Sequence, residues 1–140
     1  MMNGRTPLYL TLVAGAVLAG AVVVFQPYSA EWPGRGYTEP AQRYLGAAIR
    51  QDSVALVRLS ASPRAVAWAL ATARAHRDSL AAWSHGVQAW VGTRHADTTE
   101  VFVFNASSEV CRQTPIVLHF VGSGQSVRVV HASSPCLGDR

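Results

Sequence analysis

Residues 80–91, with the sequence LAAWSHGVQAWV, contain the point at which the pattern of apolar residues changes. Before Gly86 apolar residues recur every three or four positions, as on one face of a helix, and after it they alternate, as in a half-buried strand. His85 and Gly86 mark the boundary, because glycine commonly ends a helix in the left-handed conformation. A chain that is helical before this point and extended after it is expected to form an α+β domain.

Three helices are predicted upstream of this boundary. Thr38, Glu39 and Pro40 supply an N-cap, an acidic residue and a proline, which together predict a helix start. Asp52 is expected to begin a shorter helix over residues 52–59, and Ser62 with Pro63 to begin the longest helix, over residues 63–84. The predicted buried stripe of this long helix is Val66, Ala69, Leu70, Ala73, Leu80 and Trp83. Trp68 lies off the stripe, so it either makes a second contact or is an exposed aromatic residue.

Four strands are predicted downstream, over residues 87–94, 99–105, 115–121 and 126–131. The connections at 95–98 and 122–125 are short enough for antiparallel hairpins. The second and third strands are apolar on both faces, whereas helices can cover only one face of a sheet. The other face is therefore expected to close a pocket, to curl on itself or to meet a partner.

The histidines give no metal-binding pattern. They stand at positions 76, 85, 95, 119 and 131, and this spacing matches no compact metal motif. A four-residue turn at 122–125 places His119 opposite Arg128, so His119 and His131 are not expected to be cross-strand partners. His95 and Asp97 could form an acid–base pair, but an exposed turn collects such residues without catalysis. We therefore expect no enzyme activity, no metal and no cofactor.

Residues 8–25, LYLTLVAGAVLAGAVVVF, contain no charged residue. A helix of this length covers roughly 27 Å, close to the hydrocarbon thickness of a bilayer, so we predict a transmembrane helix. A cleaved signal peptide is the alternative, but it would place bulky Tyr28 at position −3 of the cleavage site. Arg5 favours a cytoplasmic N-terminus at 1–7, followed by the span, a linker at 26–37 and a periplasmic α+β domain at 38–140.

Small residues recur four positions apart within this segment, at Gly15, Ala16, Ala19 and Gly20. They could form a narrow face on which another transmembrane helix packs closely. Ordinary alanine and glycine content in an apolar segment is an equally good interpretation.

Composition and cysteine usage bear on the compartment. The net charge of +4 is spread along the chain without a run of basic residues, so it gives little support for binding to nucleic acid or to anionic lipid. All twelve basic residues are arginine, as expected of a GC-rich bacterium. Cys111 and Cys136 are the only cysteines, and one disulfide between them is the leading interpretation, with two buried thiols as the alternative. A disulfide would place the domain outside the cytoplasm.

The segment 41–56, AQRYLGAAIRQDSVAL, resembles the opening of cystatin-like α+β domains, in particular of the nuclear transport factor 2-like superfamily and its small bacterial membrane-anchored members. The resemblance implies helices packed on a curled antiparallel sheet that enclose a cone. Enzymes of that superfamily place an acid–base pair in the cone. Here His119 and His131 have no carboxylate in the last two strands, so the catalytic pattern is not carried over, and noncatalytic members serve as ligand pockets or assembly domains.

These observations predict a noncatalytic accessory or scaffolding subunit of a bacterial inner-membrane complex. Energy-transducing complexes, such as photosynthetic reaction-centre and antenna systems or respiratory enzymes, are the first candidates. The alternative is a membrane-anchored binding module that holds a small apolar ligand or peptide in the cone. The aromatic residues expected to contact a partner or ligand, unless they only pack the core, are Trp68, Trp90, Phe102, Phe104 and Phe120.

Overall fold

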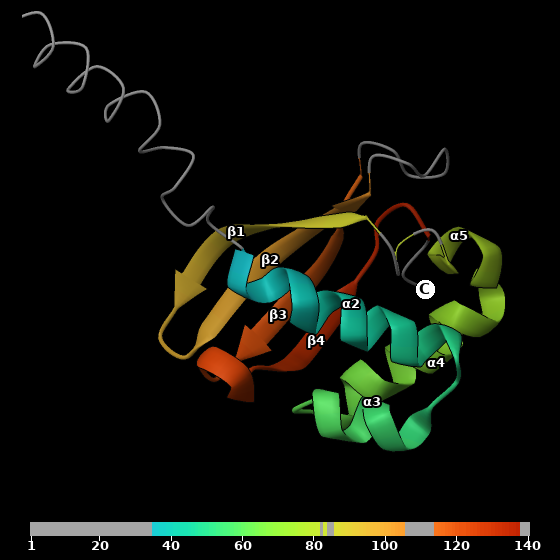
Figure 1. Ribbon diagram of the computed structural model, residues 1–140, viewed down its shortest axis with the longest axis horizontal. Coiled ribbons are helices and arrows are strands. Elements are labelled where there is room, and N and C mark those ends of the chain that lie inside the picture. Colours follow the sequence, from blue (N-terminus) through green and yellow to red (C-terminus); the bar gives the residue numbers. More distant parts are fainter. Residues whose placement is uncertain (1–34, 82, 84–85, 106–113, 138–140) are drawn as a thin grey trace, which may run out of the picture. The chain divides into compact units, whose positions relative to one another are not determined.

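Helices precede an antiparallel sheet in the computed structural model, which describes residues 35–81, 83, 86–105 and 114–137. The helices in these ranges are α2 (Arg35–Ile49), α3 (Ser53–Leu59), α4 (Pro63–Ala75) and α5 (Arg77–Ala81). The strands are β1 (Val87–His95), β2 (Thr98–Asn105), β3 (Ile116–Val121) and β4 (Arg128–Ser133), in the order β1-β2-β3-β4. The predicted α+β class is confirmed, with a four-stranded antiparallel, curled sheet crossed on one face by α2 (Figure 1).

The start of α2 differs from the prediction. The helix begins at Arg35, three residues before Thr38, so Pro40 lies inside it and residues 35–37 are helical although the sequence assigned them to the linker. Proline has no backbone N–H, so Pro40 removes the helical hydrogen bond to the carbonyl of Gly36. The helix tolerates this loss because Gly36 lies in its first turn.

The N-cap predicted at Thr38 is wrong because α2 already begins at Arg35, whereas the helix starts predicted at Asp52 and Ser62 are confirmed. Asp52 Oδ1 accepts a hydrogen bond from the backbone N of Ala55 at 2.9 Å, which caps α3. Ser62 Oγ accepts from the backbone N of Ala65 at 3.2 Å and donates to the carbonyl of Val130 at 2.5 Å. Ser62 therefore both starts α4 and ties that start to β4.

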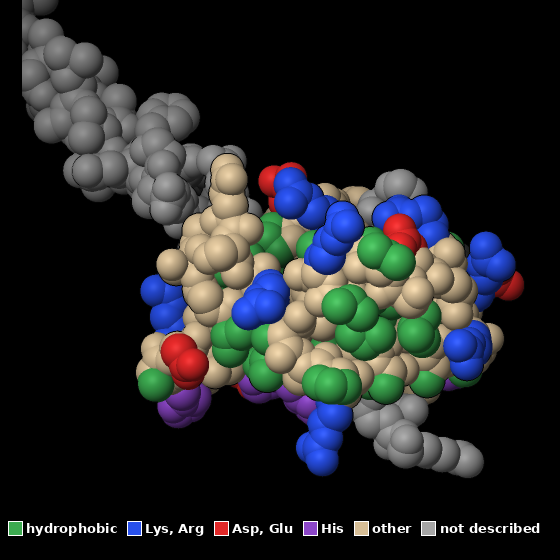
Figure 2. All heavy atoms as spheres, turned by 90° about the horizontal axis from the view of Figure 1, so that it is seen from below, with side chains coloured by type: hydrophobic (Ala, Val, Ile, Leu, Met, Phe, Trp, Pro, Cys, Tyr) green, Lys and Arg blue, Asp and Glu red, His purple; other side chains and the backbone are tan. Residues whose placement is uncertain are grey.

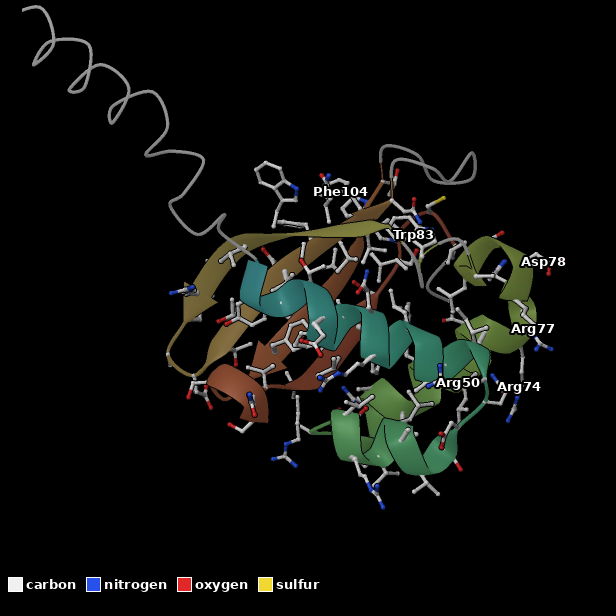
Figure 3. The ribbon with its side chains drawn as sticks, viewed as in Figure 1. Arg50, Arg74, Arg77, Asp78, Trp83 and Phe104 are labelled. Atoms are coloured by element: carbon white, nitrogen blue, oxygen red, sulfur yellow. The ribbon has the colours of Figure 1, made fainter. Side chains whose placement is uncertain are left out.

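The single long helix predicted over 63–84 is wrong, because the chain breaks at His76. This residue has φ −136° and ψ 40°, and its backbone N donates to Thr72 O at 2.8 Å while its own carbonyl accepts from Leu80 N. Arg74 in the last turn of α4 and Asp78 in the first turn of α5 complement the two helix ends that the break creates. These residues lie at the outer end of the helices, and Arg74 Nε donates to Gln51 Oε1 at 3.3 Å (Figure 3).

The buried stripe of α4 is also narrower than predicted. Its buried residues are Ala65, Ala69 and Ala73, whereas Val66 and Leu70 are only partly buried. Small residues at this stripe leave room for the large side chain of Tyr44 on α2, which is fully buried and donates its hydroxyl to the carbonyl of Ala65 at 2.6 Å.

The β3–β4 pairing departs from the predicted register. Residues 124–126 form a 3₁₀ turn, so β4 begins at Arg128, opposite Val121. The register then shifts between His119 and Phe120, where β4 carries an extra residue, and His119 pairs with His131. The prediction that these two histidines are not cross-strand partners is therefore wrong.

Among the described residues, no helix combines the length and the apolar character needed to cross a membrane. The predicted span at 8–25, with Gly15, Ala16, Ala19 and Gly20, lies outside these residues, as does Cys111.

Candidate functional site

The face of the sheet that turns away from the helices is the candidate functional surface. Burial alternates along β2: Val101 and Val103 are fully buried on the helix-facing side, whereas Glu100, Phe102 and Phe104 point to the other side and are partly exposed. The same alternation on β3 places Val117, His119 and Val121 on this outer face. We call the side of the sheet that carries these six residues and Trp90 the outer face.

An apolar row crosses three strands of the outer face. Trp90 on β1 pairs with Phe102 on β2, and Phe102 pairs with Val117 on β3. Trp90 is 40% exposed, while Phe102 and Val117 are partly exposed. Phe104 lies on the same face, two residues further along β2 and opposite Gln88, near the end of the strand (labelled in Figure 3). Side chains paired in this way support one another and form a continuous apolar strip.

A polar row lies beside this strip. Glu100, His119 and His131 occupy successive cross-strand positions on β2, β3 and β4. His119 Nε2 lies 3.8 Å from Glu100 Oε2, and the rings of His119 and His131 are 5.5 Å apart, centroid to centroid. The Glu100 and His119 side chains are 28% and 29% exposed, so solvent screens their attraction. Among the described residues, no group of histidine, cysteine and acidic side chains is arranged to hold a metal ion.

The five aromatic residues predicted to contact a partner or ligand do not lie together. Trp90, Phe102 and Phe104 share the outer face. Phe120 is buried on the opposite, helix-facing side, with its ring 5.2 Å from that of Tyr37. Trp68 is on α4 and stacks on Tyr44, with ring centroids 6.4 Å apart and an angle of 10° between the planes. Trp68 therefore makes the second contact that its position off the main stripe allowed.

The interior between helices and sheet is packed with large side chains. Tyr44, Trp83 and Phe120 are at most 2% exposed there, and Trp83 lies where the helical region approaches the sheet (Figure 3). Burial raises the pKa of the Tyr44 hydroxyl well above its usual range, because a phenolate would lose its hydration there. Among the described residues, these side chains occupy the region where the resemblance implies a cone.

The other predicted functional residues lie apart from the outer face or outside the description. His95 and Asp97 are exposed at the β1–β2 turn, where Thr98 Oγ1 donates to Asp97 Oδ1 at 3.4 Å. Cys136 is exposed in the turn that follows β4, and its predicted partner Cys111 is not among the described residues, so the disulfide stays a prediction.

The sequence interpretation missed the polar row. Strict alternation over residues 98–105 already places Glu100 on the same side as Phe102 and Phe104. The pairing of His119 with His131 had no such signal, because it depends on a 3₁₀ turn and a bulge that alternation does not reveal.

Comparisons of the chain with protein-family models, with curated proteins and with solved structures give no match. The resemblance to nuclear transport factor 2-like domains therefore stays a prediction from the sequence pattern.

Proposed function

We propose that this protein is a noncatalytic accessory or scaffolding subunit of a bacterial membrane complex and that it binds another protein subunit through the outer face of its sheet. The observation that carries the proposal is the strip of Trp90, Phe102 and Val117, an apolar row that crosses three strands on the face away from the helices. Half-exposed aromatic residues beside polar groups are typical of protein interfaces, because they bury a large apolar area and keep a polar rim.

A ligand-holding module is the second candidate, and the packing of the interior weighs against it. Such a module needs an apolar cavity between helices and sheet. Here Tyr44 and Phe120 occupy that region, and Phe120 contacts Tyr37 rather than lining a pocket with Trp90 and Phe102. An outer surface that binds protein accounts for the exposed aromatic residues without an internal ligand.

The membrane setting of this proposal comes from the sequence. The apolar segment 8–25 anchors the chain in the inner membrane with its N-terminus in the cytoplasm, and Gly15, Ala16, Ala19 and Gly20 give that segment a face for a neighbouring helix. The domain that follows is periplasmic, where a Cys111–Cys136 disulfide is stable. Energy-transducing complexes, photosynthetic or respiratory, are the first candidates for the host, and nucleic acid is not a partner.

The test is recovery of the native complex. The full-length chain, tagged at its C-terminus and expressed in its own host, is extracted in mild detergent and separated by native electrophoresis. We expect co-migration with other subunits, reduced by Trp90→Gln combined with Phe104→Gln and unchanged by Arg77→Gln on the exposed surface of α5. Migration of the wild-type chain alone would refute the scaffold proposal. If the double variant still migrates with the other subunits, the outer face of the sheet is not the surface that binds them.

A further inference from the structure

A second surface lies on the short helix α3. Val54 and Val57 are 62% and 63% exposed, the highest values among the large apolar side chains described. Their spacing of three residues puts both on one side of the helix, and Arg58 follows four residues after Val54 on the same side. Leu56 is fully buried and fastens the opposite side of α3 to the core. The exposed valines therefore lie on a short helix whose opposite side is packed against the core.

Two adjoining grooves that share Arg58 and Leu59 border α3, and both are lined by arginine. One groove, of about 440 Å³, lies between α2 and α3 and includes Arg43, Arg50 and Arg58. The other, of about 430 Å³, runs from α3 to the β3–β4 turn and includes Arg58 and Arg128. Seen from the side of α3, the surface shows hydrophobic side chains gathered among blue arginine side chains (Figure 2).

The acidic residues nearby leave most of this charge unbalanced. Among the residues described, none of those lining the two grooves is acidic. Glu39 pairs with Arg43, and the Asp52 carboxylate is engaged by the backbone N of Ala55 at the start of α3. Within the described part of the chain, Arg50, Arg58 and Arg128 make no ion pair. The surface is therefore complementary to an array of anions.

We propose that this surface docks on a bilayer that contains anionic phospholipids. Guanidinium groups bind phosphate through paired N–H donors, and the two grooves put such groups beside α3, with Arg58 on the same side of the helix as Val54. Val54 and Val57 can then enter the boundary between headgroups and acyl chains, as apolar residues of interfacial helices do. An exposed apolar pair with basic residues beside it fits a lipid surface better than an acidic protein, because the protein would need a pocket that accepts the valines.

This inference does not rest on the proposed function, since it uses α3 and its grooves rather than the outer face of the sheet. Each arginine near an anionic membrane surface contributes roughly a fivefold increase in affinity, and salt screens that contribution. A surface of this kind would hold the domain in a fixed orientation on the bilayer.

The test places a benzophenone photo-cross-linking side chain at Val57 of the full-length protein. The matched control carries it at Ala71, which is exposed on α4. Both proteins are reconstituted into vesicles of phosphatidylcholine alone and of a phosphatidylcholine–phosphatidylglycerol mixture. After illumination, mass spectrometry measures the fraction of protein that carries a lipid adduct, and circular dichroism verifies the fold of each variant.

We expect adducts at position 57 in the mixed vesicles, several-fold fewer in phosphatidylcholine alone and few at position 71. Arg50→Gln combined with Arg58→Gln should reduce the yield at position 57 by an order of magnitude or more, following the fivefold contribution of each arginine, as should high salt. Equal adduct yields at positions 57 and 71, or a yield at position 57 that is the same with and without phosphatidylglycerol, would overturn the proposal. A protein adduct in place of a lipid adduct at position 57 in native membranes would overturn it as well.

Discussion

The ring of Phe102 lies over Gly92: a β-carbon on residue 92 would come within 2.4 Å of Cε2 of Phe102 and 2.7 Å of Oε1 of Glu100. Gly92 belongs to the part of β1 where the register with β2 shifts between Val91 and Arg94. An aromatic ring that covers a glycine on a neighbouring strand shields exposed backbone and fixes the ring in place. Phe102 of the apolar row and Glu100 of the polar row thus both lie against Gly92, the position on β1 that has no side chain.

Replacement of Gly92 by alanine should disturb this arrangement. The added methyl group must displace Phe102 and Glu100, and overpacking of this kind costs about 1–3 kcal/mol of the free energy of unfolding. Urea denaturation of the full-length protein measures the loss. Gly36→Ala is the control, because a β-carbon there meets no atom within 4 Å, and in α2 alanine should be neutral or stabilise the helix. Equal stabilities of Gly92→Ala and the wild type would contradict the close contact.

Removal of the Tyr44 hydroxyl should destabilise the domain. This hydroxyl donates to the carbonyl of Ala65 at 2.6 Å in a buried position that links α2 to the first turn of α4. Tyr44→Phe removes this buried hydrogen bond, which costs about 1–2 kcal/mol. Tyr37→Phe is the control, because its hydroxyl donates to Thr99 Oγ1 over 3.3 Å in a partly exposed site and should matter less.

Tyr44 also predicts how stability changes in alkaline solution. Burial raises the pKa of its hydroxyl in the folded state above the unfolded value of about 10. The unfolded state therefore loses this proton first, so the contribution of Tyr44 is complete below about pH 10 and falls by up to about 1.4 kcal/mol per pH unit above it. Denaturation of the wild type should show this decline between neutral and strongly alkaline pH. Tyr44→Phe should show a shallower decline, and identical slopes would exclude the mechanism.

Local chemistry predicted much of the helical half of the fold. Asp52 and Ser62 were identifiable as caps because a cap depends only on a side-chain oxygen and a backbone N three residues later. The break at His76 was not, since Ala73 and Leu80 continue a helical apolar pattern on both sides of it. Only the observed dihedral angles of His76 show that the chain turns there.

The sheet shows the corresponding limit for the candidate site. Alternation separates Phe102 and Phe104 from Val101 and Val103, but both sets are apolar, so it cannot say which of them the helices cover. Phe120 was grouped with Phe102 for the same reason, although the two residues lie on opposite faces. The pairing of His119 with His131 depends on the adjacent bulge, between His119 and Phe120, which no pattern in the sequence reveals.

Ala96 offers a stabilising substitution at the β1–β2 turn. It is the first of the two residues that join the strands, and its φ of 48° falls in the left-handed region that disfavours a β-carbon. Ala96→Gly should raise the free energy of unfolding by roughly 0.5–1 kcal/mol, as measured by thermal or urea denaturation. Ala71→Gly, in the exposed middle of α4, should instead lower it by about 1 kcal/mol. A loss of stability in both variants would show that the turn gains nothing from glycine.

The predicted disulfide can be tested through Cys136. This residue follows β4 in a turn whose next residue, Leu137, is buried and donates its backbone N to Ser134 Oγ at 3.2 Å. A bond to Cys111 would close a loop of roughly 25 residues and, by restricting the unfolded chain, contribute about 3 kcal/mol. Protein purified from the membrane fraction without reductant should therefore have an intact mass two hydrogens below that of the reduced chain and should lose this stability on reduction. The Cys111→Ser, Cys136→Ser double variant is the control, since a reductant should leave its stability unchanged. Two titratable thiols in the native protein would instead favour the alternative of unpaired cysteines, and the argument for an oxidising compartment would then rest on the segment 8–25 alone.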